Sequence, residues 1–576
     1  MGTSRIAILT LIVAAESIAG PLWSAEPTPR QVVMVPLRDG VRLKTNIFFT
    51  GAADEAKPVL LLRTPYNQET YNGQAQRCAE AGFVAVTQDC RGRFGSEGQF
   101  VFYWGEGPDG FDTVEWLRER PWCNGRIGMW GTSYLGSVQW LTAAEGTNLT
   151  ALAPAASAPN FYYNVHLGGV YLLSHAKGGF CMDLFGPATK LESSPDWPQL
   201  YMHLPLTDWG RHLKRELPWQ MNMISHDRPD GFWKRADTTP AIPQMSFPAQ
   251  HIVGYYDFMC RESVGGFQAM CKRSATEFSR AHQQLILGPW DHSVGERNAG
   301  EVDFGPTAEL DVLTENLRWF NRFLRDEDSA SSAFDRVRYF SLGENRWRLA
   351  TCWPPEEAVD QFWYLSSAGH ANTRRGDGVL SQSQSDEQEP ADVFRSDPDD
   401  PVPCWPAKVR QYQEVWGPVD QALCQDRDDV LVYQSKPLDR PLWFAGSPSL
   451  DLYVATDSLD ADWVVKLIDV DPGGVCLPLA MGVRRGSTRE SELHPSPMEP
   501  GRHYRLTVEL GHSAARIDKG HRLGIQIAGS NFPLFARNLH MAEGPAGINK
   551  KIAQQQVFHS SSELSRLVLP IIKSQD

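Results

Sequence analysis

The chain has 576 residues, of which 42% are hydrophobic and 22% are charged. This composition is ordinary for a globular protein, and the length predicts two or three domains. The net charge of −14 argues against a nucleic-acid partner, because proteins that bind nucleic acid present a basic surface. The acidity indicates a soluble protein instead.

The first 25 residues have the pattern of an export signal. Arg5 gives a positive start, an apolar run covers 6–15, and Ala19 or Ala25 ends a stretch of small residues that suits cleavage. Ten apolar residues are too few to span a bilayer as a helix. An uncleaved anchor or a buried first helix is the alternative. We expect a periplasmic or secreted protein with no membrane span after signal removal.

From residue 26 to 160, predicted strands alternate with predicted helices. Such alternation implies a parallel sheet with helices on both faces. The first two predicted strands form a hairpin. Its turn lies at Asp39 and Gly40, a pair that is a strong turn signal. The expected elements are the hairpin over 31–49, strands over 58–66, 82–90 and 151–158, a helix over 109–120, and a strand, sharp turn and helix over 126–145.

Residues 161–240 change character, since aromatic side chains and helix-like runs replace the strand pattern. We interpret them as an inserted helical cap. The sheet then resumes over 241–350, with strands within 247–257 and 283–293 and a long amphipathic helix over 307–327. Residues 351–576 contain many short strands separated by turns, which predicts an all-β sandwich. The predicted fold class is therefore α/β with a C-terminal all-β domain.

Ten cysteines lie beyond the signal, and none forms a C-x-x-C pair, which argues against a zinc ribbon or a redox motif. Export would allow some of them to form disulfides. Scattered buried thiols are the alternative, and the spacing does not decide the pairing.

A serine between two glycines follows the strand predicted near residue 130. The stretch runs from Gly131 through Ser133, Tyr134 and Leu135 to Gly136. In the usual nucleophile elbow, G-x-S-x-G, the second glycine comes two positions after the serine, whereas here it comes three positions after. Glycines still flank the bend, where backbone segments of a tight turn crowd together. On this segment alone, a strand end without chemistry is an equal alternative.

A serine hydroxyl needs a base to take its proton and a carboxylate to orient that base. In hydrolases of this architecture the acid and the histidine follow later strands, in that order. Asp257 and His292 occupy such strand ends. Asp291 is a competing acid, and His251 is expected to be a structural histidine within a strand. The remaining competing histidines lie in the cap or on helices: His166, His175, His203 and His282.

Acyl transfer also needs hydrogen-bond donors for the oxyanion that develops in the transition state. The backbone N–H of Tyr134, directly after the serine, is one candidate. The Tyr66 hydroxyl, in the loop after an early strand, is the other, and Pro65 restricts its backbone. An ordinary packed aromatic is the alternative for Tyr66.

Several segments resemble one known family. They are "RTPYNQ", "GFVAVTQDCRGRFGSEGQF", "DTVEWLRERPWCNGRIGMWGTSYLGSVQW", "GYYD", "LILGPWDHS" and "HRLGIQIAGSNFPLFARNL". In this order they are similar to bacterial cocaine esterase, X-prolyl dipeptidyl-peptidases, glutaryl acylases and α-amino-acid ester hydrolases. The resemblance covers nearly the whole mature chain, and members share the G-x-S-Y-x-G form of the elbow.

The resemblance implies an α/β-hydrolase domain, a helical cap and a C-terminal jelly roll. It implies a triad of Ser133, Asp257 and His292, with an oxyanion hole made by the Tyr66 hydroxyl and the Tyr134 amide. Relatives often assemble, so a homo-oligomer is implied as well. The corresponding domains are the signal 1–25, the hydrolase domain 26–160 and 241–350, the cap 161–240 and the jelly roll 351–576.

The chain departs from the family at several positions. Leu135 stands where the α-amino-acid ester hydrolases have an acidic residue, and we identify no carboxylate cluster for a substrate ammonium group. The segment "YYDFMC" around Asp257 is aromatic and apolar, which favours a hydrophobic or neutral acyl group. After "DPVP" this chain continues with "CWPAK" instead of threonine and glycines.

These observations predict a serine hydrolase that cleaves an ester or amide bond of a small acyl substrate through an acyl-enzyme. The chemistry requires no metal and no organic cofactor. The alternatives are an X-Pro dipeptidyl-peptidase, which would act on short peptides, and a non-catalytic jelly-roll binding protein. Trp197, Trp209 and Phe232 in the cap are candidate walls of the acyl site, and core packing is the other interpretation.

Overall fold

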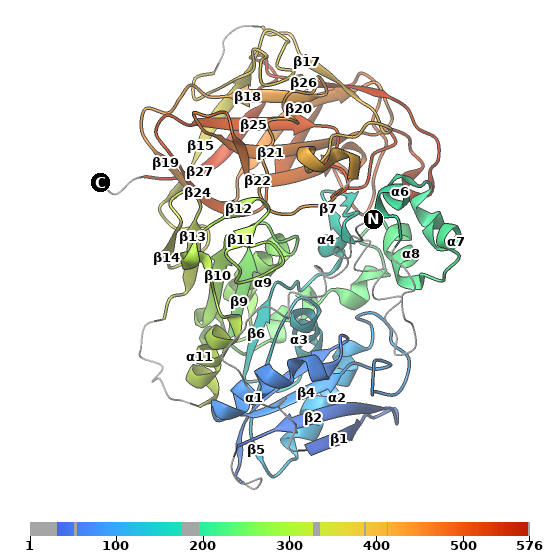
Figure 1. Ribbon diagram of the computed structural model, residues 1–576, viewed down its shortest axis with the longest axis vertical. Helices are drawn as coiled ribbons and strands as arrows, with labels where there is room; N and C mark the ends of the chain where they lie inside the picture. The colour runs from blue at the N-terminus through green and yellow to red at the C-terminus, as the bar shows by residue number, and fades with distance from the viewer. Residues whose placement is uncertain are drawn as a thin grey trace, which may run out of the picture.

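A computed structural model describes residues 31–50, 55–175, 195–325, 334–384, 388–411 and 413–573. The expected export signal over 1–25 lies outside the described residues, as does Cys181. Figure 1 shows an elongated molecule with the α/β part, blue to green, at one end and an all-β part, orange to red, at the other. Among the described residues, no helix combines the length and apolar character needed to cross a bilayer.

A ten-stranded sheet organises the α/β part. Its order is β1-β2-β4-β3-β5-β6-β9-β10-β13-β14; the strands from β4 to β13 run parallel to one another, and β1, β2 and β14 pair antiparallel at the two edges. The bounds are β1 (Gln31–Pro36), β2 (Arg42–Phe48), β3 (Lys57–Thr64), β4 (Val84–Asp89), β5 (Cys123–Thr132), β6 (Ala151–Ala155), β9 (Ala249–Gly254), β10 (Gln283–Gly288), β13 (Val337–Ser341) and β14 (Arg346–Ala350). The predicted alternation of strands and helices is confirmed.

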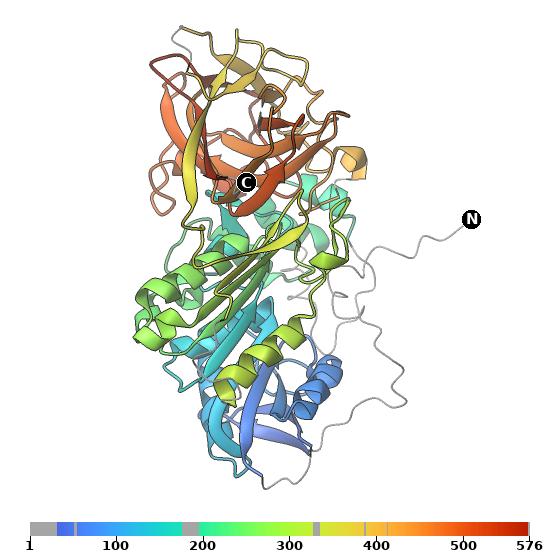
Figure 2. The ribbon, with the colours of Figure 1, turned by 90° about the vertical axis from the view of Figure 1, so that its left-hand side faces the viewer.

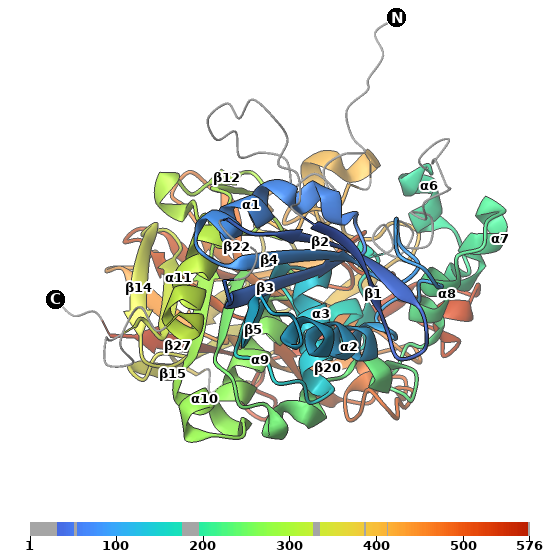
Figure 3. The ribbon, with the colours of Figure 1, turned by 90° about the horizontal axis from the view of Figure 1, so that it is seen from below.

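Helices cover both faces of this sheet because the side chains of the buried strands alternate between two cores. On β3, Leu60 and Leu62 share a cluster with Phe320 of α11, whereas Leu61 packs in a cluster with Val114 of α2. Figure 3 shows α1 on one side of the strands β2, β4 and β3, with α2 and α3 on the other. The helices are α1 (Asn72–Glu80), α2 (Glu106–Arg118), α3 (Tyr134–Ala144), α9 (Cys260–Arg273), α10 (Glu277–Ala281) and α11 (Val312–Leu324).

The segment expected to form the cap contains short helices and one small hairpin. Residues 176–194 within it lie outside the described part. The described elements are α4 (Tyr162–Val165), β7 (His166–Leu167), β8 (Val170–Tyr171), α6 (Trp197–Met202), α7 (Trp209–Leu213) and α8 (Pro218–Ser225). Val170 and Leu172 pack in one apolar cluster with Val464 and Val483 of the all-β part. The cap therefore contacts both parts of the molecule.

Thirteen strands form the all-β part, which Figure 2 shows stacked on the end of the α/β sheet. They are β15 (Ala358–Ser366), β16 (Val379–Ser381), β17 (Asp392–Ser396), β18 (Val430–Gln434), β19 (Leu442–Gly446), β20 (Ser449–Thr456), β21 (Asp462–Val470), β22 (Cys476–Arg485), β23 (Tyr504–Glu509), β24 (Ser513–Ile517), β25 (Arg522–Ala528), β26 (Ala553–Phe558) and β27 (Arg566–Ile572). The predicted C-terminal all-β domain is confirmed. A further two-stranded sheet, β11 (Asn298–Ala299) and β12 (Val302–Asp303), lies in the loop after β10.

Candidate active site

Four of the residues singled out in the sequence lie just beyond the carboxyl ends of parallel strands. Tyr66 follows β3, Ser133 follows β5, Asp257 follows β9 and His292 follows β10. From β3 the chain first adds β4 on one side and then β5 on the other, so β3 and β5 flank the point where the strand order reverses. Open α/β sheets bind ligands at such a point.

Ser133 occupies a sharp turn between β5 and α3. Its φ is 64° and its ψ is −125°, a conformation that non-glycine residues rarely adopt and that marks functional turns. A Cβ on Gly131 would lie 2.5 Å from Leu135 Cβ, and one on Gly136 would lie 2.6 Å from Ser157 Cβ. The glycine three positions after the serine is therefore required, because it faces the segment that follows β6.

Three side chains from distant segments, Ser133, His292 and Asp257, form a continuous hydrogen-bonded line, which we call the relay. His292 Nε2 lies 2.8 Å from Ser133 Oγ, and His292 Nδ1 lies 3.0 Å from Asp257 Oδ2. The other oxygen of Asp257 accepts a hydrogen bond from the Met259 amide at 2.8 Å. The Asp257 side chain is fully buried, whereas that of His292 is 29% exposed. This arrangement lets the imidazole accept the serine proton while the carboxylate fixes its tautomer.

The electrostatic surroundings favour a protonated His292. Burial disfavours the imidazolium, but the charge of Asp257, the hydrogen bond that His292 Nδ1–H donates to it, and the charge of Asp291 outweigh burial and raise the pKa of His292 above its ordinary value of 6.5. Asp291, the competing acid, accepts a hydrogen bond from the Ser293 amide at 2.8 Å. Asp291 therefore acts on the imidazole through its charge, whereas Asp257 is the carboxylate that is hydrogen-bonded to the imidazole.

The two residues that are expected to supply the oxyanion donors contact each other through their rings. The Tyr66 ring meets the Tyr134 ring edge-on, with centroids 6.2 Å apart. The Tyr66 amide donates to Thr64 Oγ1 at 3.0 Å, and Arg93 Nε donates to the Pro65 carbonyl at 3.0 Å. The backbone that carries the Tyr66 phenol is therefore held on both sides, and Tyr134 starts the helix that follows the serine.

A group of aromatic side chains lies beside His292, with Phe258 in contact with its ring. The Phe258 ring lies 4.5 Å from the imidazole, and Trp416 lies 5.5 Å from Phe258. His175, from the cap, meets Phe258 edge-on at 4.3 Å. Burial, together with the nearby His292, lowers the pKa of His175 to about 3, so His175 is neutral at ordinary pH. The wall beside the relay is thus apolar and uncharged.

The other sequence candidates lie elsewhere. Trp209 is 1% exposed and packs with Tyr201, and Trp197 also packs against Tyr201 at 5.6 Å. The Phe232 ring stacks on His226. Trp209 and Trp197 therefore pack within the cap, whereas the Phe232 ring also lies 4.6 Å from that of Trp104 in the hydrolase part.

His251 is buried on β9 between the Trp140 and Phe267 rings, as expected for a structural histidine. The remaining competing histidines also have local partners: the His166 ring stacks on Tyr162, that of His203 on His212, and that of His282 on Phe334. His175 is the exception, because it reaches the relay through Phe258.

Sequence reasoning missed Trp416 and His175 as neighbours of the relay. Trp416 belongs to a loop of the all-β part, and no local pattern shows that this loop returns to the hydrolase sheet.

The nine described cysteines are free thiols, six of them buried. Within the described ranges, no cluster of three or more histidine, cysteine or acidic side chains is arranged to hold a metal ion.

Known protein families and solved structures match both parts of this chain. The X-Pro dipeptidyl-peptidase (S15 family) pattern matches residues 39–294, and that of the X-Pro dipeptidyl-peptidase C-terminal non-catalytic domain matches 332–568. The cocaine esterase of Rhodococcus sp. (strain MB1 Bresler) is 33% identical over 574 residues, which cover 94% of this chain and 98% of the relative.

Two solved structures share the whole architecture. An aminopeptidase from the marine sediment archaeon Thaumarchaeota archaeon superposes with a TM-score of 0.82 at 23% identity, over 97% of this chain and 100% of that one. An α-amino acid ester hydrolase superposes with a TM-score of 0.81 at 25% identity, over 96% and 99%. The chain therefore belongs to the family of cocaine esterase and the S15 X-Pro dipeptidyl-peptidases, and it is a serine hydrolase that acts on ester or amide bonds.

Proposed function

We propose that Ser133, His292 and Asp257 form the catalytic triad and that the substrate is an ester of an apolar, aromatic acid. The observation that carries the triad is the unbroken line from Ser133 Oγ to His292 Nε2 at 2.8 Å and from His292 Nδ1 to Asp257 at 3.0 Å. The strained backbone of Ser133 supports the same assignment, because it presents the hydroxyl at the end of the sheet.

The proposed reaction has two halves. His292 takes the proton of Ser133 as the oxygen attacks the carbonyl carbon, and the Tyr134 amide and Tyr66 hydroxyl stabilise the oxyanion. His292 then gives its proton to the leaving alcohol, which departs and leaves an acyl-enzyme. Water repeats the sequence: it loses a proton to His292, attacks the acyl carbon, and the acid is released while Ser133 regains its proton.

The aromatic wall supports an apolar acyl group. Phe258 and Trp416 offer ring faces and edges, which bind aromatic groups through burial and offset contacts. A dipeptidyl-peptidase must instead hold a protonated amino terminus, for which a carboxylate is the suitable partner. The two carboxylates nearest the imidazole, Asp257 and Asp291, are engaged with backbone amides and with His292. The relative named cocaine esterase is consistent with an ester substrate.

Release of X-Pro dipeptides is the second candidate, because the S15 pattern covers the part of the chain that holds the relay. The two candidates separate on three chromogenic substrates: 4-nitrophenyl benzoate, 4-nitrophenyl acetate and Ala-Pro-4-nitroanilide. We expect kcat/KM for the benzoate to exceed that for the acetate by at least about tenfold, the usual scale for filling an apolar pocket. Faster cleavage of the anilide than of either ester would favour the peptidase.

Export is also a proposal, based on the charged and apolar pattern of residues 1–25. The full-length gene expressed in a Gram-negative host should give a periplasmic or secreted protein whose intact mass lacks these residues. A cytoplasmic protein of full mass would contradict it.

A further inference from the structure

A buried ion pair lies behind the two proposed oxyanion donors and touches neither Ser133 nor His292. Arg63 is 0% exposed and Glu106 is 2% exposed. Arg63 Nη2 lies 2.9 Å from Glu106 Oε2, and Arg63 Nη1 donates to the Glu106 carbonyl at 2.7 Å. Arg63 Nε donates to Gln88 Oε1 at 2.8 Å. The guanidinium therefore ties β3, β4 and the start of α2 together.

The same carboxylate also holds the side chain of Tyr134. The Tyr134 hydroxyl donates to Glu106 Oε1 at 2.9 Å and accepts a hydrogen bond from the Tyr103 amide at 3.2 Å. Its ring stacks on that of Tyr103, with centroids 4.5 Å apart and planes 17° apart. Tyr134 is thus fixed at both ends: its hydroxyl by Glu106 and Tyr103, and its backbone by the turn at Ser133.

These contacts join the two halves of the oxyanion hole. Arg63 precedes Tyr66 by three residues on the same strand end, and Tyr134 supplies the amide next to Ser133. A displacement of about 1 Å in a group that contacts the reacting atoms can cost about 100-fold in rate. Fixed side chains behind such a group are the means by which a protein prevents that displacement.

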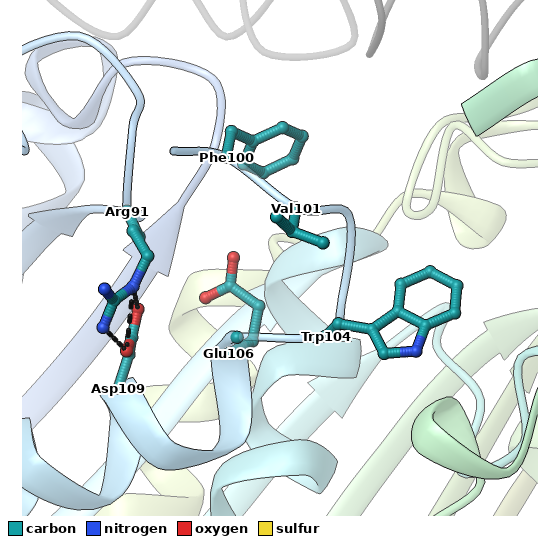
Figure 4. A pocket seen from close by; sticks show the side chains of 7 residues that line it. Arg91, Phe100, Val101, Trp104, Glu106 and Asp109 are labelled. Carbon is teal, nitrogen blue, oxygen red and sulfur yellow. Dashed lines mark hydrogen bonds and ion pairs between the residues drawn. The ribbon is translucent and has the colours of Figure 1, made fainter. Parts of the chain in front are cut away.

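The Glu106 carboxylate also lines a cavity. Figure 4 shows it pointing into a cavity beside Phe100 and Val101, with Trp104 at the opposite wall. The cavity has a volume of about 200 Å³. Arg91 also lines this cavity, and it pairs with Asp109 at 2.6 Å. Within this buried setting, the Tyr134 hydroxyl and the Arg63 guanidinium are the groups that hold the orientation of the Glu106 carboxylate.

We propose that Glu106 is a positioning residue of the oxyanion hole, which acts through the Tyr134 hydroxyl and the Arg63 guanidinium to aim the Tyr134 amide and the Tyr66 phenol at one oxygen. This rests on the proposed function, in which those two groups stabilise the oxyanion. Glu106 touches no reacting atom, so its removal should affect the transition state and leave substrate binding nearly intact.

The test uses the full chain with Glu106→Gln and Tyr134→Phe. Tyr134→Phe removes the hydroxyl alone and leaves the Arg63–Glu106 pair in place, so it is informative even if Glu106→Gln folds poorly. Kinetics on 4-nitrophenyl benzoate give kcat and KM. Inhibition by benzeneboronic acid, whose tetrahedral serine adduct places an oxygen in the oxyanion hole, reports on that hole directly. A matched control is Asp462→Asn, which disrupts another buried carboxylate–arginine pair, Asp462–Arg485 at 2.8 Å, in the all-β part.

We expect both variants to lose about 10- to 100-fold in kcat, less than the loss of a complete oxyanion donor, with KM changed less than about twofold. The affinity for the boronic acid should fall in proportion to kcat/KM. Asp462→Asn should keep wild-type kinetics. Unchanged kcat in folded Tyr134→Phe, or a lower kcat with unchanged boronic acid affinity, would overturn the inference. If a fluorophosphonate fails to label Ser133 in the wild type, the triad itself fails, which is a separate result.

Discussion

His292 Nε2 lies 2.8 Å from Ser133 Oγ, although 159 residues separate the two in the chain. A second serine–histidine pair in the molecule has the same spacing: Ser447 Oγ lies 2.8 Å from His512 Nδ1. Burial lowers the pKa of His512 to about 4, and the Trp353 indole also approaches the same nitrogen. The two pairs differ because His292 is also bonded to the Asp257 carboxylate. That carboxylate orients the imidazole ring and stabilises the positive charge that the ring gains.

This contrast predicts which serine reacts. Ser133→Ala should abolish covalent labelling by a fluorophosphonate and reduce kcat by about 10⁴- to 10⁶-fold, since the nucleophile is lost. Ser447→Ala, which removes a hydroxyl at the same distance from a histidine, should label and turn over like the wild type. Mass spectrometry of the labelled peptide locates the site. Labelling that persists in Ser133→Ala would refute the triad.

The pH below which kcat/KM falls should be higher than for an enzyme whose base is an ordinary histidine. His292 must be neutral to accept the serine proton, and its pKa is raised above 6.5 by neighbouring carboxylates that outweigh burial. Activity should therefore fall as the pH drops through a value above 6.5. Asp291→Asn removes one of the charges that raise this pKa, so this acid limb of the pH profile should move to lower pH while kcat at the plateau is largely kept.

The measurement for this prediction is kcat/KM against pH at constant ionic strength. Asp303→Asn serves as a control, because that carboxylate pairs with Arg297 on the surface. An acid limb that stays in place in Asp291→Asn would show that the charge of Asp291 does not reach the imidazole.

The sequence was sufficient to predict that Ser133, Asp257 and His292 lie close together, because each follows a strand with a clear pattern. The run before Ser133 is apolar, and Asp257 and His292 each lie a few residues after a buried strand. Parallel strands bring their carboxyl ends to one edge, so strand recognition alone predicts proximity. The resemblance then selected Tyr66, for which local pattern offers no more than a strand end.

The supporting residues could not be predicted in the same way. Glu106 and Arg63 are charged residues, which are usually exposed, yet here both are buried against each other. Trp416 reaches the relay through the placement of a whole domain. Such contacts depend on tertiary packing between segments far apart in sequence, and no periodicity within either segment records them.

Phe258 should control the preference among acyl groups. Phe258→Ala removes the ring that lies 4.5 Å from His292, and truncating a partly buried aromatic side chain removes apolar contact. We expect kcat/KM for 4-nitrophenyl benzoate to fall about 10- to 100-fold, with a smaller loss for the acetate, whose acyl group cannot reach the wall. Phe278→Ala, which truncates an aromatic side chain that is 48% exposed on α10, is the control. Equal losses for both esters would place the acyl group elsewhere.

A buried histidine in the all-β part should make stability depend on pH. His559 Nδ1 lies 2.6 Å from Glu389 and Nε2 lies 2.9 Å from Asp392, and its side chain is fully buried. Burial disfavours the imidazolium, but the two carboxylates outweigh it and raise the pKa of His559 above 6.5. Because the folded-state pKa is the higher one, the stabilisation is complete below the unfolded value and is lost as the pH rises through the folded value.

His559→Gln removes this titration. At about pH 6, breaking the buried pair should lower the free energy of unfolding by about 3–5 kcal/mol, and the difference from the wild type should shrink as the pH rises through the raised folded-state pKa of His559. Calorimetry across that range measures the gap in Tm between the two proteins. His503→Gln is the matched control, because His503 Nδ1 contacts Glu563 at 2.7 Å but its side chain is 45% exposed, and exposed pairs contribute about 1 kcal/mol or less. A difference in Tm between the wild type and His559→Gln that stays constant with pH would show that the imidazole is not charged in the folded protein.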